Sequence, residues 1–144
     1  MSISGFSQEK LTWHTDMEKA IDIATKENKK MMLFFTGSDW CGWCIKLQNE
    51  VLKTSDFEKW ANKNVVLVEL DFPRRTAQAE NIKAQNGQLQ HMFQVRGYPT
   101  IYFVKPEKKL DGKTNLSSLG KTGFVRGGPS KWLTVANNII QGNL

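Results

Sequence analysis

Two cysteines, Cys41 and Cys44, are the only ones in this chain of 144 residues, and two residues separate them. In the chain-entropy description, a disulfide that closes so short a loop stabilises a fold by only about 2 kcal/mol, against nearly 5 kcal/mol for a loop of about 100 residues. A pair of neighbouring thiols can instead exchange electrons with a disulfide on another molecule. The spacing therefore favours redox chemistry over a structural cross-link.

The cysteines lie where a buried strand is expected to meet a helix. Residues 31–36 are apolar without alternation, which is typical of a strand covered on both faces. After a break at 37–39, apolar residues return with helical spacing over 41–52. Cys41 is thus predicted at a helix N-terminus, where unpaired amides and the helix dipole favour its thiolate. Cys44, about one turn further on the same face, would resolve the mixed disulfide that Cys41 forms with a substrate.

Expected helices and strands alternate along the rest of the chain. Capping-box spacings start at Thr15 and at Ser55, and Trp13, Met17 and Ala20 share the apolar face of the first helix. The turn sequence Asp111-Gly112 predicts a long hairpin. The other expected helices are 41–52, a short one from 55, one through 89–93 and one from 129 or 130 to 142; the expected strands are 31–36, 65–70, 100–104 and 119–126, and the first helix covers about 16–28.

This order of elements predicts an α/β fold with three layers, α/β/α, and a mixed central sheet. In such sheets, sites gather at the carboxyl ends of the parallel strands, which is where Cys41 is expected. We expect one domain over 1–144, with residues 1–12 as an N-terminal tail.

Composition excludes several classes of partner. The net charge is +6, but only four of the 20 basic residues are arginine, and the basic residues are scattered without a nucleic-acid motif. No apolar run approaches the roughly 18 residues that cross a bilayer, and residues 1–6 do not resemble an export signal. We expect a monomer with no nucleic-acid partner and no membrane span.

Two segments together resemble the thioredoxin superfamily: WCGWC at 40–44, after a buried strand, and GYPT at 97–100, before a later strand. Within the superfamily, 34–41 and 68–73 are similar to the exported bacterial group of DsbH-type disulfide reductases. The resemblance implies a thioredoxin fold with an N-terminal extension helix. It also implies an enzyme that reduces protein disulfides, with isomerisation as a secondary activity, in the periplasm or another exported location; the cytoplasm is the alternative.

The same resemblance implies roles for residues beside the cysteines. Pro99 matches the proline that follows a cis peptide bond in the family and faces the cysteine pair, and the Tyr98 backbone would pair with an extended substrate. Trp40, Gly42 and Trp43 complete the expected substrate-binding set, with core packing as the alternative for each tryptophan. The expected partners are disulfide-bonded proteins and an upstream reductant protein. No cofactor is expected beyond the redox-active cysteine pair.

One position departs from the family pattern. Thioredoxins proper carry a buried acid six positions before the first cysteine, and here that residue is Phe35. Cys44 must therefore lose its proton to solvent, to the leaving thiolate or to another acid such as Glu69, for which an outward-facing position is the alternative. The Gly-Trp pair between the cysteines supplies no positive charge and Asp39 should slightly oppose the thiolate, so we predict a reducing protein.

Two readings from other classes remain. A closed zinc site needs about four ligands, and only His14 and His91 could join the two thiolates in a histidine and cysteine site. Neither histidine has a zinc-finger spacing. The third interpretation is a binding or chaperone module that keeps the fold without catalysis, for which the aromatic residues around the cysteines would supply an apolar surface.

Overall fold

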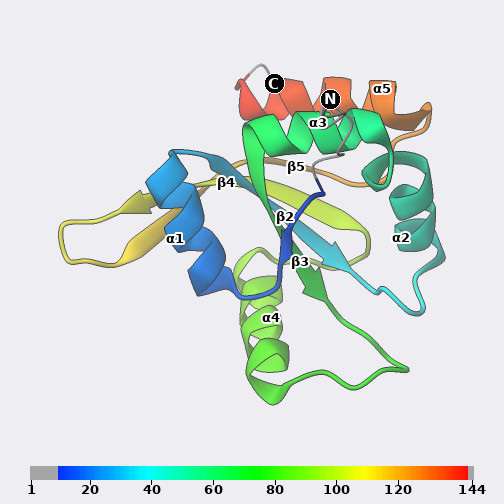
Figure 1. Ribbon diagram of the computed structural model, residues 1–144. Coiled ribbons are helices and arrows are strands. Elements are labelled where there is room, and N and C mark those ends of the chain that lie inside the picture. Colours follow the sequence, from blue (N-terminus) through cyan, green and yellow to red (C-terminus); the bar gives the residue numbers. More distant parts are fainter. Residues whose placement is uncertain (1–9, 143–144) are drawn as a thin grey trace, which may run out of the picture.

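A single sheet runs through the middle of the protein in the computed structural model, which describes residues 10–142 (Figure 1). Its strands are β1 (Trp13–His14), β2 (Lys30–Thr36), β3 (Val65–Asp71), β4 (Thr100–Lys108) and β5 (Thr114–Thr122). They lie in the order β1-β3-β2-β4-β5. β3 pairs parallel with β1 and β2, whereas β4 pairs antiparallel with β2 and β5. The expected mixed sheet is confirmed, with β2 at its centre.

Helices cover both faces of this sheet, so the three-layer α/β/α arrangement is confirmed (Figure 1). The helices are α1 (Met17–Glu27), α2 (Gly42–Leu47), its π-helical continuation η2 (Gln48–Leu52), α3 (Ser55–Asn64), α4 (Glu80–Met92) and α5 (Gly128–Ile140). α1 and α4 cover one face, and α2, η2, α3 and α5 cover the other. Among the described residues, no helix is both long enough and apolar enough to span a bilayer.

The alternation of side chains along β2 explains its unbroken apolar sequence. Met32 and Phe34 point into the cluster beneath α2, α3 and α5, whereas Met31, Leu33 and Phe35 point into the cluster beneath α1 and α4. All five are fully buried. A strand with helices on both sides has no polar face, as the sequence pattern indicated.

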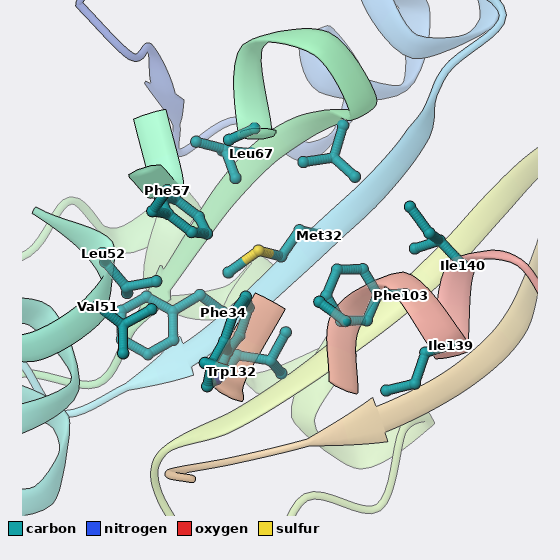
Figure 2. Packing of buried hydrophobic residues seen from close by; sticks show 14 of the residues in the cluster. Met32, Phe34, Val51, Leu52, Phe57, Leu67, Phe103, Trp132, Ile139 and Ile140 are labelled. Carbon is teal, nitrogen blue, oxygen red and sulfur yellow. The ribbon is translucent and has the colours of Figure 1, made fainter. Parts of the chain in front are cut away.

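Aromatic rings hold α5 against the first of these clusters (Figure 2). The buried Trp132 ring lies 5.7 Å from Phe57 and 6.3 Å from Phe103, measured between ring centroids. Its Nε1 donates a hydrogen bond of 3.0 Å to the Gly123 carbonyl in the loop after β5. The core therefore fixes the segment that leads from β5 to α5.

The two helix N-caps lie one residue away from the capping boxes expected from the sequence. Asp16, and not Thr15, caps α1 by accepting a hydrogen bond from the Lys19 amide. Thr54, and not Ser55, caps α3. In each case the cap has an extended backbone directly before the first helical residue, so its side-chain oxygen reaches the amide three positions further on.

The N-terminal part of the chain differs from the expectation. Trp13 does not extend the face of α1: it lies in β1, and its ring packs 5.8 Å from Phe34 on the other side of the sheet. Only two residues, Thr15 and Asp16, separate β1 from the observed start of α1, so Trp13 precedes the helix and cannot extend its apolar face. Residues 1–9 of the expected tail lie outside the described residues, and residues 10–12 are in neither helix nor strand.

The hairpin begins its return earlier than expected. Residues 114–122 form β5, where the sequence indicated 119–126. Lys109 and Lys113 close a tight turn through a hydrogen bond of 2.8 Å, and Gly112 adopts a φ of 83° there. Because the turn is short, the charged stretch around it pairs as strand along both arms instead of forming a loop.

Candidate active site

Cys41 and Cys44 form a disulfide at the N-terminus of α2. Cys41 is the N-cap residue, and its Sγ accepts a hydrogen bond of 3.2 Å from the Cys44 amide. Cys41 is 6% exposed and Cys44 is 1% exposed, so Cys41 is the cysteine nearer the surface. When the pair is reduced, the same amide and the helix dipole favour a thiolate on Cys41.

The turn between β2 and α2 is built around Gly37 and Trp40. The Gly37 carbonyl accepts hydrogen bonds from the amides of Trp40 (3.2 Å) and Cys41 (2.9 Å). A Cβ on residue 37 would overlap the Trp40 indole, so only glycine fits beneath this ring. Trp40 Nε1 donates to the Phe72 carbonyl at 2.7 Å, and the ring meets Tyr98 edge-on at 5.8 Å. Trp40 is therefore fixed directly beside the first cysteine.

Two aspartates join this turn to the loop after β3. Asp39, in the turn, accepts hydrogen bonds from three successive amides, those of 74–76, at 2.8 to 3.0 Å. Asp71, at the end of β3, accepts hydrogen bonds from the amide and hydroxyl of Ser38. We call Asp39 and Asp71 the aspartate latch. Asp39 thus binds the loop after β3, and Asp71 binds the turn after β2.

The electrostatics of the latch follow from its donors. The Arg74 amide is the largest influence that lowers the pKa of Asp39, and the amides of Arg75 and Thr76 and the Thr76 hydroxyl add to it; partial desolvation opposes them. The Asp39 carboxylate is therefore ionised over the physiological pH range. Its charge is directed at backbone amides, which compensate the repulsion of the thiolate that was expected from Asp39.

Pro99 lies at the same end of the sheet as the cysteines. The peptide bond between Tyr98 and Pro99 is cis, which confirms the geometry that the resemblance implied. Thr100, the next residue, begins β4 and pairs with Phe35, one residue before the end of β2. The end of β2, which leads to the cysteines, and the start of β4, which follows the cis bond, therefore lie side by side at the same edge of the sheet.

The other side of the cysteines carries an exposed aromatic surface. The Trp43 side chain is 51% exposed, and its ring centroid lies 5.2 Å from that of Phe124 in the loop after β5. Lys46 Nζ lies 5.1 Å from the centroid of the Trp43 ring. Gly42 is exposed, and a Cβ there would meet open space. Trp43 is therefore not a core residue, whereas Trp40 is half-buried and packs against its neighbours.

The structure places Phe35 and Glu69 on opposite faces of the sheet. Phe35 belongs to the cluster beneath α1 and α4. Glu69 pairs in register with Phe34 and shares the face of Leu67, towards α2 and α3, so it is half-buried and does not face outward. Burial raises the pKa of Glu69, and the charge of Asp71 raises it further. Within residues 10–142, its carboxyl makes no hydrogen bond or ion pair.

His14 lies in β1 and His91 in α4. Across the described residues, no three side chains of His, Cys, Asp or Glu come together as a group that could hold a metal ion.

Residues 17–114 match the family described as "Thioredoxin-like domain". The chain is 33% identical over 131 residues to "Disulfide bond reductase DsbH" of Chlamydia pneumoniae, covering 91% of this chain and 74% of that protein. A solved structure titled "DsbH Oxidoreductase" superposes with a TM-score of 0.82 at 30% identity, covering 98% of this chain and 92% of the other. "Protein disulfide-isomerase A4" of Bos taurus is 32% identical over 110 residues, 72% of this chain but 15% of that protein.

The lowered pKa of Asp39 predicts how the stability of Asp39→Asn depends on pH. The pKa of Asp39 is lowered in the folded protein, so the ionised carboxylate stabilises the fold at pH values above the usual aspartate pKa of about 4. That contribution is lost as the pH falls through the folded-state pKa. Urea unfolding should show that the variant is less stable than the wild type at pH 7 and that the difference shrinks towards pH 3. Asp22→Asn, on the exposed side of α1, is the control; an equal deficit at both pH values would contradict the prediction.

Glu69→Gln should have the opposite effect. Burial raises the pKa of Glu69, so its ionised form opposes folding at pH values above the folded-state pKa, whereas the protonated form does not. The variant should therefore have a higher free energy of unfolding than the wild type at pH 7 to 8. This gain should disappear below about pH 4, where Glu69 is protonated in both states. The exposed Glu18→Gln should show no gain, and a Glu69→Gln variant that is less stable at pH 8 would refute the account of its burial.

Proposed function

The chain belongs to the thioredoxin-like family, and from this premise we propose that it reduces disulfide bonds in protein substrates, with Cys41 as the attacking thiol and Cys44 as the resolving thiol. Relatives named as disulfide reductase and disulfide-isomerase, together with the disulfide between its two cysteines, identify the chemistry as thiol-disulfide exchange. The observation that carries the division of roles is the position of the pair: Cys41 caps α2 nearer the surface, and Cys44 lies deeper.

The first step forms a mixed disulfide. The Cys41 thiolate attacks one sulfur of a substrate disulfide, a bond forms between the two sulfurs, and the other substrate sulfur leaves as a thiolate that takes up a proton. The free amides at the start of α2 support this step because they stabilise the thiolate at neutral pH. Trp43 is exposed and the cis bond before Pro99 lies at the same end of the sheet as the cysteines, and we assign the docking of an extended substrate to these residues.

The second step releases the product. The Cys44 thiolate attacks Sγ of Cys41, the disulfide between the two cysteines forms, and the remaining substrate sulfur leaves and is protonated. Two electrons pass from the cysteine pair to the substrate, and two protons end on the substrate thiols. The Cα atoms of the two cysteines lie 5.2 Å apart, which is within the range that a disulfide spans without moving the backbone.

Cys44 must lose a proton before it attacks. Phe35 occupies the position of the acid found in thioredoxins proper, and it lies on the other face of the sheet from α2. Glu69 faces the side on which α2 lies and has a raised pKa, so it would be a base only at pH values above that pKa. The substrate thiolate that leaves in the first step is already present and needs no such residue, and we propose that it accepts the Cys44 proton before the second attack.

A donor outside the chain must return two electrons to the pair after each cycle. We propose a thiol-bearing reductant protein, in the periplasm or another exported compartment, because the similar segments 34–41 and 68–73 point to the exported reductases. We propose reduction as the net direction, since no positively charged residue that would stabilise the thiolate lies between the cysteines.

Two serine variants test the assignment. Cys41→Ser should lower the rate of dithiothreitol-driven reduction of a protein disulfide by at least about 100-fold, because the attacking sulfur is lost. Cys44→Ser should still attack but should accumulate a covalent adduct with the substrate, which mass spectrometry would detect as a mixed disulfide. The double variant is the control for thiol-independent binding. If the single variants reduce insulin as fast as the wild type, the chain is a binding module and the proposed function is wrong.

A further inference from the structure

Arg74 is held beside the cysteine pair at both its backbone and its side chain. Its amide donates to Asp39 at 3.0 Å, and its guanidinium carbon lies 3.5 Å from the centroid of the Trp40 ring. Trp40 is itself fixed by its hydrogen bond to the Phe72 carbonyl. Figure 1 shows the loop after β3 projecting from the same end of the sheet as the turn between β2 and α2. These contacts restrain both the backbone and the charged side chain of Arg74.

No acid in the described part of the chain neutralises this guanidinium. The two ion pairs there join Lys29 to Glu27 and Lys46 to Glu50. The nearest carboxylates along the loops, those of the aspartate latch, are bound by backbone amides and by Ser38. The positive charge of Arg74 is felt at Tyr98, where it lowers a hydroxyl pKa that burial raises. The charge therefore lies next to Trp40 and Tyr98, two residues of the expected substrate surface. No acidic side chain among residues 10–142 forms an ion pair with it.

The geometry of the stack leaves the arginine able to bind a planar anion. A guanidinium that lies with its carbon over an aromatic ring keeps the N–H groups at its edge free, and that edge matches the two oxygens of a carboxylate. The stack also removes much of the side-chain freedom that an exposed arginine would lose on binding. Arg75, the next residue, also donates its amide to Asp39, but its side chain contacts no aromatic ring among residues 10–142.

We propose that Arg74 is a specificity-determining residue, which binds an aspartate or glutamate side chain close to the disulfide of the substrate. This inference rests on the proposed function, because the acidic residue is recognised while the Cys41 sulfur attacks its neighbour. The substrates favoured by this protein are disulfides flanked by acidic residues. The tryptophan that borders the cysteine pair positions the cation as well as supplying apolar surface.

The test uses three synthetic peptides that contain one disulfide and differ only in the residue beside the cysteine, which is Glu, Gln or Lys. The rate constant of the reduced protein is measured with each peptide, and the readout is the ratio of the Glu rate to the Gln rate. The wild type should give a ratio of about 3 to 5, as expected for one solvent-accessible ion pair, and the Lys peptide should be slowest. High salt should lower the ratio. Arg74→Gln should bring it close to 1, whereas the matched control Arg75→Gln should leave it unchanged.

Each other outcome overturns the inference. A wild type without a preference, or an Arg74→Gln variant that keeps the preference, would exclude binding by Arg74. An equal loss in Arg75→Gln would show that the overall basic charge attracts acidic peptides and that the stacked arginine has no special part. The Gln peptide separates the two proposals: if it is reduced without any Glu preference, this inference fails alone, and if the wild type reduces no peptide, the proposed function fails with it.

Discussion

The active site depends on the hydrogen bonds between two neighbouring loops. Parallel strands β2 and β3 end at the same edge of the sheet, and each is followed by a loop with unpaired amides. Asp39 from one loop and Asp71 from the other satisfy those amides across the gap. Trp40 adds a third link through the Phe72 carbonyl. The hydrogen bonds within the turn before α2 set its local shape, and these links fix the turn against the loop after β3.

The core and the site are held by different kinds of interaction. The buried clusters on both faces hold the sheet and the helices, whereas the latch holds the polar loops above them. Since the pKa of Asp39 is lowered, the latch keeps its charge when the pH changes in the neutral range. Each tryptophan that flanks Cys41 carries a cation on its ring: Arg74 on Trp40, and Lys46 on Trp43. Aromatic surface and positive charge therefore occur together around the sulfur.

Much of this site could be predicted from local patterns, and the parts that could not are made by contacts between distant residues. The apolar run of β2 and the helical spacing after it placed Cys41 at a helix N-terminus, and the resemblance predicted the cis bond at Pro99. The bonds of Asp39 cross 35 to 37 positions of sequence, so no local pattern contains them. An aspartate at the end of each of two parallel strands was the available signal. Trp13 was misplaced for the same reason, because the partners of β1 lie in β3.

The reduction potential of the cysteine pair tests the central claim most directly. It can be measured by equilibrating the full chain with buffers of defined thiol and disulfide content and following the fluorescence of its tryptophans. No positively charged residue between the cysteines stabilises the thiolate, so the protein should be reducing and its potential should lie near that of thioredoxin, about −270 mV. A value near −120 mV, typical of the strongest oxidants of the superfamily, would contradict the account, because the disulfide would then be donated to substrates and not taken from them.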